Sequence, residues 1–531
     1  MNVATLPTQA SPSLAEDREK ARRAWIGYIA MIFGNFMAIL DIQIVASSLK
    51  EIQAGLSASA DELTWVQTSY LIAEVIAIPL SGYLSRMMST RLYFVMSALG
   101  FTLASLLCAF AWNIQSMIVF RVLQGFLGGG MIPTTVGAIF LLFPAEKRAL
   151  PTILVGLAMT SAPALGPTLG GAITAYYSWH WLFFINILPG ALIAITVWNY
   201  VSFDRPDWSL FKKIDVIGLI GMALFLGGLE FVLDEGPRHD WLQDETVLRV
   251  FWVMVVGAAI FFWRAFTNAH PIVEIRTWRN ANFAIGSISA FVVGVMIFGM
   301  VYILPTFLGT VRGYNSLQIG QVMMVMGTCM FATAPLVGRL AAKVDLRLML
   351  AYGFAMVALG TWWNAHLTAD AGFWQFFGPQ VMRGHGFMFC MICTTGIAMG
   401  TLTPEEVKNG SGLFNLMRNL GGAIGLACIN TGLHERQWQH YSHLSNAIND
   451  SRAPVREALT QGSAALTPNL GAVDAQHATL ANLGRLVLRE ATVMSFNDVM
   501  LVMSLVCAAA ILLLPFADRP DPLGAAGAEV H

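Results

Sequence analysis

The chain carries a succession of apolar stretches, each about as long as the roughly 20 residues that a helix needs to cross a membrane. Of its 531 residues 56% are hydrophobic and 12% are charged, and its mean hydropathy is +0.62. Soluble domains carry about 25% charged residues. The sequence therefore predicts an all-α polytopic membrane protein of about fourteen spans, with little room for a separate soluble domain.

The expected spans follow from the apolar stretches and the polar segments between them. They are 25–49, 63–84, 92–112, 114–140, 152–174, 181–201, 215–233, 248–267, 282–308, 318–341, 347–367, 373–400, 410–432 and 492–516. Most of the 31 Lys and Arg residues fall in segments on one side of these spans. By the positive-inside rule both termini are expected in the cytoplasm, which requires an even number of spans. The polar segment 1–24 lacks the apolar core of a signal peptide, so the first apolar stretch is expected to remain as a span.

A weak internal repeat divides the chain. Gly82–Phe94 and Gly338–Leu350 both begin Gly-x-Leu and carry an Arg nine residues after the Gly, Arg91 and Arg347. Repeated halves around a central site are typical of alternating-access transporters. We expect six-helix bundles at 25–201 and 281–516, two inserted helices within 202–280, and tails at 1–24 and 517–531. A long outer loop with patches of helical periodicity is expected at 434–491.

The stretch 154–174 contains no charge but four Gly and two Pro residues. Gly166 and Gly170 share one helix face and permit close approach of another backbone, and Gly171 follows directly. Pro163 and Pro167 remove backbone donors and bend the helix. The stretch predicts either a plain small-residue packing seam or an interface at which two bundles rock.

Charged residues inside spans are costly and usually face a cavity or a partner. Asp41 and Arg121 are expected about 12 Å and 11 Å from the outer ends of their spans, so the two can pair. The pair either fixes helix packing or contains a proton-exchanging carboxylate tuned by Arg121.

A polar stripe marks the second span. Glu74 lies about 16 Å deep, and Gln67, Tyr70 and Ser81 follow the same helical spacing. Glu74 is either a proton- or cation-handling group or a satisfied buried acid. Arg383 and Arg418 are expected to be structural or gating residues, and Glu230, near the outer end of its span, to snorkel.

No feature of the sequence indicates a cofactor or a metal. Cys390 and Cys393 form a CxxC inside an apolar stretch without partner ligands, which favours packing. The chain has no G-x-x-x-x-G-K-[ST] loop, so a pump of this kind draws on an ion gradient or on another subunit. No nucleophile–base–orienter set suggests an enzyme.

Several motifs resemble one transporter family. They are Leu40-Asp41-x-x-Ile44-Val45, Trp65-Val66-x-Thr68-Ser69-Tyr70-Leu71, Arg121-x-x-Gln124-Gly125, Ala162-Pro163-Ala164-Leu165-Gly166-Pro167-x-x-Gly170-Gly171, Trp179-x-Trp181-x-Phe183-x-Ile185-Asn186 and Gly412-Leu413-x-Asn415-x-x-Arg418-Asn419-x-Gly421-Gly422. Together they resemble the fourteen-helix drug:proton antiporters of the major facilitator superfamily, the EmrB/QacA type, over nearly the whole chain.

The resemblance implies proton coupling at Asp41 and places Gln124 in the fourth-helix motif, beside the candidate gating or substrate residues Gln67 and Tyr70. It implies export of amphipathic, often cationic compounds across an inner membrane, with a periplasmic adaptor and an outer-membrane channel as possible partners. One motif departs. In the superfamily's G-x-L-A-D-R-x-G-R-K loop, here at Gly82 to Arg91, Arg86 replaces the acid and Ser89 the second Gly. The usual cytoplasmic charge lock therefore lacks its acid.

Three functions remain open at this point. The first is proton-coupled export of amphipathic drugs. The second is export of one dedicated metabolite, such as a siderophore or a fatty acid. The third is a sensor or scaffold that has the transporter fold but moves no substrate.

Overall fold

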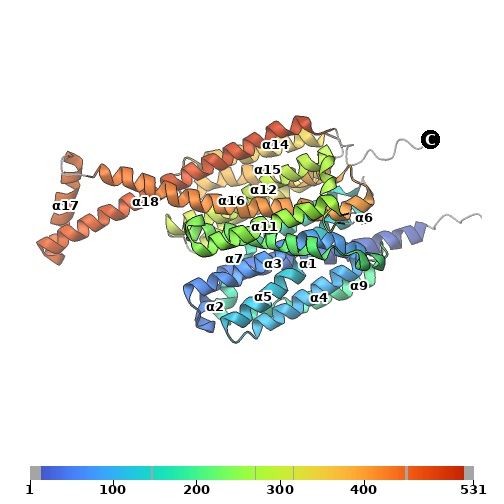
Figure 1. The fold of residues 1–531 in the computed structure, drawn as a ribbon. Helices are drawn as coiled ribbons and strands as arrows, with labels where there is room; N and C mark the ends of the chain where they lie inside the picture. Colours follow the sequence, from blue (N-terminus) through green and yellow to red (C-terminus); the bar gives the residue numbers. More distant parts are fainter. Residues whose placement is uncertain are drawn as a thin grey trace, which may run out of the picture.

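The computed structural model describes residues 14–144, 147–268, 271–314, 316–341, 343–448 and 452–518. Within these ranges the chain is helical apart from its linkers, and it contains no strand. Figure 1 shows the long helices running side by side, with residue 14 and residue 518 at the same end of the bundle. We call this end the terminal end and the opposite one the distal end. The expected all-α class is confirmed.

The described helices follow one another in this order: α1 (Leu14–Ser47), α2 (Leu49–Leu56), α3 (Ala60–Met88), α4 (Thr90–Ala109), α5 (Ile114–Gly128), α6 (Met131–Leu142), α7 (Ala149–Tyr176), α8 (Trp181–Phe184), α9 (Ile187–Tyr200), η2 (Trp208–Lys213), α10 (Val216–Glu235), η3 (Gly236–Arg238), η4 (Trp241–Gln243), α11 (Glu245–Thr267), η5 (Ile275–Arg279), α12 (Ala281–Thr310), α13 (Ser316–Ala341), α14 (Leu346–Asn364), α15 (Phe373–Met399), α16 (Pro404–Asn446), α17 (Ala453–Leu470), α18 (Ala472–Ala510) and η6 (Ile511–Phe516).

Among the described residues, 12 helical segments are long and apolar enough to cross a membrane. The expected fourth span is formed by α5 and α6 in succession. Two further helices, α7 with 28 residues and α15 with 27, lie where the fifth and twelfth spans are expected. Both pack against other spanning helices. Helices are the form these segments take because lipid offers no partner for a free backbone amide.

Polar residues in the linkers set where the helices begin. Ser59 and Glu62 form a capping box at the start of α3, and Thr403 and Glu406 form another at the start of α16. The carboxylate of Asp244 accepts from the first amides of α11. Each cap satisfies backbone donors that the first helical turn leaves without partners.

The helices pack as two groups. In the first bundle α1 contacts α7 and α9, and α4 contacts α5 and α9. In the second bundle α12 contacts α15 and α16, and α14 contacts α15 and α18. The sequence repeat has a structural counterpart, because Arg91 and Arg347 are each the second residue of a helix, α4 and α14.

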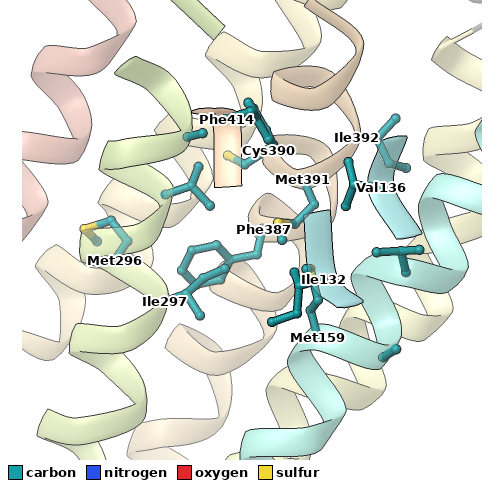
Figure 2. Packing of buried hydrophobic residues seen from close by; sticks show 14 of the residues in the cluster. Ile132, Val136, Met159, Met296, Ile297, Phe387, Cys390, Met391, Ile392 and Phe414 are labelled. Carbon is teal, nitrogen blue, oxygen red and sulfur yellow. The ribbon is translucent and has the colours of Figure 1, made fainter. Parts of the chain in front are cut away.

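Apolar side chains of α6, α7 and α15 form part of the contact between the two bundles. Figure 2 shows Ile132 and Val136 of α6 and Met159 of α7 beside Met391 and Ile392 of α15, all members of one buried cluster. Unbranched methionines adapt to irregular gaps and tolerate rearrangement. This contact between bundles is therefore held by burial of apolar surface and not by a fixed polar network.

The two inserted helices lie on one side of α3. Helix α10 packs against α3, α11 and α16, whereas α11 packs mainly against α10. Trp252, Trp263 and Phe266 of α11 are exposed. An apolar face of this kind suits lipid, so α11 forms the outer layer and α10 lies between it and the two bundles.

The segment 434–491 differs from the expected loop. Helix α16 continues without a break to Asn446, and α18 already begins at Ala472. Figure 1 shows both helices extending beyond the distal end of the bundle, with α17 across their tips. The polar composition of this segment indicates exposure to water, and it does not prevent helix formation.

Candidate functional site

The centre of the first bundle holds a buried polar cluster around Asp41. Its Oδ2 accepts from Arg121 Nη1 at 2.7 Å, and its Oδ1 accepts from Gln124 Nε2 at 3.1 Å and from Asn186 Nδ2 at 2.7 Å. The side chains of Asp41 and Arg121 are fully buried. Three side chains therefore donate to one buried carboxylate.

Arg121 is positioned by α3. Its Nε donates to the carbonyl of Val66 at 3.1 Å, and its Cζ lies 4.2 Å from the centroid of the Tyr70 ring. Gly125 allows α5 to approach this part of α3, since an added Cβ there would collide with the Tyr70 carbonyl. The structure thus brings together Asp41, Arg121, Gln124 and Tyr70, four of the residues that the sequence singled out.

A second polar region lies between the two bundles. It is a cavity of about 190 Å³. Its polar and charged lining residues are Gln43, Gln67, Glu74, Glu230, Arg418 and Asn419, and its walls include Leu71, Ile297, Phe298, Val301 and Met391. Drug-sized sites usually measure about 300–1,000 Å³. The cavity must therefore widen before it can hold such a molecule.

Glu74 faces this cavity and is 5% exposed. Across the described part of the chain, no side chain or backbone group forms a hydrogen bond or a direct ion pair with its carboxylate. The expected polar stripe on α3 therefore divides. Gln67 and Glu74 line the cavity, whereas Tyr70 turns toward Arg121.

The two arginines of the second bundle occupy different places. Arg418 lines the cavity, donates to Asn415 Oδ1 at 2.6 Å and contacts Met159 Sδ of the first bundle at 3.2 Å. Arg383 is fully buried away from the cavity, where it donates to Gln380 Oε1 at 2.7 Å and contacts Met300 Sδ at 2.8 Å. Arg418 is therefore placed to meet a substrate, and Arg383 is not.

The glycines of α7 pack against α1. A Cβ at Gly166 or Gly170 would collide with Gln43 or Ser47, whereas Gly171 has open space around it. Gly156, nearly three turns before Gly166, faces Met391 of the second bundle. Helix α7 thus packs closely against α1 of the first bundle and also borders the second bundle. The side chains of Pro163 and Pro167 lie outside what the structure describes, and the hinge role of the stretch stays a prediction.

At the terminal end, Gly82 lies against the backbone of Lys408 and Asn409 in α16. Arg86 pairs with Glu274 at 2.9 Å, and the Arg91 guanidinium lies 4.8 Å from the centroid of the Trp198 ring. Gly82, Arg86 and Arg91 therefore do not provide the carboxylate that would pair across the two bundles.

Asp204, in the linker after α9, supplies that acid. Its Oδ2 accepts from the Thr90 amide at 2.7 Å and from Lys408 Nζ at 2.6 Å. It thereby caps α4 and joins the first bundle to α16. We call the Asp204–Lys408 pair the terminal clasp.

Sequence reasoning missed three of these residues. Asn186 stands in a sequence motif that gives it no role, the sequence predicts that Glu230 snorkels, and Asp204 lies in no motif. The signal for Asp204 is that Arg86 stands where the loop motif has an acid, so the acid must come from another segment. For Glu230 no signal was available, because the packing of α10 decides which way it faces.

Comparison with known proteins identifies the family. Residues 31–426 match the model of the Major Facilitator Superfamily. This chain belongs to the major facilitator superfamily. It is 48% identical over 507 residues to the colistin resistance protein EmrB of Acinetobacter baumannii, covering 95% of this chain and 98% of that protein. It is 28% identical over 505 residues to the multidrug export protein EmrB of Escherichia coli, covering 95% and 97%.

These relatives place the chain among the EmrB-type drug:proton antiporters of the superfamily. It is also 28% identical over 507 residues to the fatty acid resistance protein FarB of Neisseria gonorrhoeae, covering 96% of this chain and 98% of that protein. Among solved structures, the proton:xylose symporter XylE has the same fold, with a TM-score of 0.57 at 12% identity over 96% of this chain and 99% of that one. The family and the fold indicate a transporter rather than an enzyme.

Proposed function

We propose that this protein exports amphipathic, chiefly cationic small molecules across a bacterial inner membrane in exchange for protons. The observation that carries the proposal is the cavity between the bundles, in which the carboxylate of the buried Glu74 accepts no hydrogen bond from the described residues. A buried carboxylate without a partner is costly, and a membrane protein retains one where a proton or a cationic ligand completes it. The names of the relatives, which include colistin resistance and multidrug export, support a drug as cargo.

The working cycle uses the Asp41 cluster as the coupling element. Protonation of Asp41 removes its attraction for Arg121, and the packing of α1, α3 and α5 then changes. Partner loss in a buried ion pair is worth about 3–5 kcal/mol, enough to shift a balance between two bundle arrangements. Substrate and proton are released on opposite sides because the two arrangements open the cavity alternately.

The test is substrate-driven proton flux in proteoliposomes under an imposed pH gradient. Cationic dyes are expected to drive proton movement, and Glu74→Gln is expected to lower that flux by at least about tenfold. Glu62→Gln is the matched control, because Glu62 lies on the same helix but is exposed and serves as a cap. If Glu74→Gln retained full cation-driven flux, the role of Glu74 would be wrong.

A dedicated metabolite exporter is the second candidate function. The Arg418 guanidinium lies in the cavity and suits a carboxylate-bearing cargo, and the FarB relative is named for fatty acid resistance. The same flux assay separates the two, because anionic amphipaths would then drive proton movement and cationic dyes would not. Absence of flux with cationic, neutral and anionic compounds would favour the sensor or scaffold function.

The terminal end is proposed to face the cytoplasm, since the positively charged linkers gather there. The distal extension of α16, α17 and α18 would then stand in the periplasm. Its exposed Trp438, Val473 and Leu480 offer apolar contact area. We propose this extension as the contact for a periplasmic adaptor that leads to an outer-membrane channel.

A further inference from the structure

A second pocket lies at the terminal end, where the chain passes from the inserted helix α11 to the second bundle. It measures about 490 Å³ and is lined by Phe266 at the end of α11 and by Ile275, Arg276, Trp278 and Arg279 of η5. It shares no lining residue with the central cavity. The pocket is therefore separate from the site described above.

The lining of this pocket is basic. Arg276 and Arg279 are exposed, and neither guanidinium group forms a hydrogen bond or an ion pair within the ranges that the structure describes. The acid that precedes them, Glu274, is already paired with Arg86 at 2.9 Å. The described lining thus carries two guanidinium groups and no carboxylate. Because the planar fork of a guanidinium matches the oxygens of a phosphate, the charge and geometry suit a phosphate group.

The apolar side of the pocket continues into the lipid-facing surface of α11. Trp263 and Phe266, in the last turns of that helix, are 59% and 63% exposed. Trp278 is half-buried, and its ring meets that of Phe283 edge-on at 6.0 Å. Aromatic residues at the end of a span mark the level of the lipid head groups. The arginines therefore lie where a head group ends and the aromatic rings lie where acyl chains begin.

The linker that carries the pocket is joined to both bundles. On one side Glu274 pairs with Arg86 of α3. On the other side the side-chain amide of Asn280 exchanges hydrogen bonds of 3.1 and 3.2 Å with the hydroxyl of Thr401. A molecule bound at η5 would thus contact a segment on which the two bundles converge.

We infer that this pocket binds the phosphate head group of an anionic phospholipid, phosphatidylglycerol or its dimer cardiolipin, from the leaflet at the terminal end. Arg276 and Arg279 contact the phosphate, and the acyl chains lie along Phe266 and Trp263. A basic residue near the membrane surface strengthens the binding of an anionic lipid about fivefold, so two of them give more than tenfold. A soluble phosphate would contact the arginines and leave the aromatic wall unused. The inference does not depend on the transported substrate, since it requires only that α11 crosses the bilayer.

The experiment measures lipid binding to the full-length purified protein by native mass spectrometry. Phosphatidylglycerol is compared with phosphatidylcholine of the same acyl chains, because the two differ in net charge. The wild type is expected to bind phosphatidylglycerol at least about tenfold more tightly, and the double variant Arg276→Gln, Arg279→Gln is expected to bring the ratio of affinities near one. The double variant Arg276→Lys, Arg279→Lys retains both charges and is expected to keep most of the preference.

A matched control removes the same charge elsewhere at the terminal end. Lys212 and Lys213 are exposed on η2 and lie outside the pocket. The double variant Lys212→Gln, Lys213→Gln is expected to leave the ratio unchanged. An equal loss of preference in this control would overturn the inference, since the lipid would then respond to the charge of the whole surface.

Two further measurements use the wild type alone, so they decide the matter even if a variant fails to fold. A phosphatidylglycerol with a diazirine in the upper acyl chain is expected to label peptides that contain Phe266 or Trp278, and labelling confined to other peptides would overturn the inference. Glycerol phosphate, which carries the phosphate without acyl chains, is expected not to displace phosphatidylglycerol at equal concentration. Displacement by it would show a site for soluble phosphates in place of a lipid site. A wild type with no preference for phosphatidylglycerol over phosphatidylcholine would also contradict the inference.

Discussion

At the scale of single residues, the Asp41–Arg121 pair has two possible roles that one double variant separates. Asp41→Asn alone leaves Arg121 buried without a counter-charge and is expected to cost about 3–5 kcal/mol of stability. The double variant Asp41→Asn, Arg121→Gln removes both charges, so its melting temperature is expected to return most of the way to the wild-type value. Proton-driven transport is expected to remain lost. Restored coupling in the double variant would mean that the pair only fixes helix packing.

The sequence was sufficient to predict this pair and not the groups that complete it. Asp41 and Arg121 lie at matching depths in their spans. Because a charge in lipid needs a partner, these two depths are enough to predict that the residues pair. Asn186 is uncharged and begins a helix after a short turn, α9. Nothing in its spacing shows that its amide reaches Asp41 at 2.7 Å. A charged partner can thus be predicted because an unpaired charge in lipid is energetically unfavourable. A neutral partner can be identified only once the packing is known.

At the scale of helices, the two bundles contain related polar clusters with different charges. Arg121 of α5 contacts Asp41 of α1 and Val66 of α3. In the second bundle Arg383 of α15 contacts Met300 of α12, while its neighbour Gln380 donates to Val322 of α13. Asn364 Oδ1, in the orientation that satisfies the network, accepts from Arg383 at 2.9 and 3.1 Å. Met300 contacts Arg383, and no carboxylate pairs with this arginine among the residues described.

Met300→Asp is therefore expected to stabilise the second bundle. The Asp Oδ atoms are as many bonds from Cα as the Met Sδ atom that already contacts Arg383. A charged hydrogen bond there is worth about 1.5–3 kcal/mol, which would appear as a higher melting temperature. Met296→Asp is the control, because Met296 lies one turn away in the apolar core and is expected to destabilise. A lower melting temperature for Met300→Asp would show that the two clusters are not equivalent.

Two features of the helices could not be predicted from the sequence pattern. Apolar length located the spans, but α16 and α18 continue as helices far beyond them, since helical hydrogen bonds also form in water. The orientation of α10 is a second case. Up to Leu229 its sequence is apolar on all sides, so no amphipathic pattern shows which face meets α3. Glu230 consequently could not be assigned to the cavity before the packing was known.

At the scale of the whole molecule, we expect the terminal clasp to influence which end of the cavity opens. Asp204 is held at the start of α4 by the Thr90 amide, and Lys408 lies in the second turn of the long helix α16. Both side chains are 13% exposed. A partly buried pair of this kind is worth more than a surface pair, and about 1.4 kcal/mol changes a two-state equilibrium tenfold. The clasp therefore favours arrangements in which the terminal end is closed.

Lys408→Ala is expected to shift the protein toward opening at the terminal end while leaving α4 capped by Asp204. Hydrogen–deuterium exchange is expected to become faster in peptides from the start of α16 and the end of α3, where Gly82 meets Lys408 and Asn409. Exchange is expected to become slower at the distal end of α7 and α13, which pack against each other and are expected to close there as the other end opens. Lys343→Ala, in the linker between α13 and α14, is the control and is expected to change neither. Faster exchange at both ends would indicate local unfolding, and the clasp would then hold the fold together without directing transport.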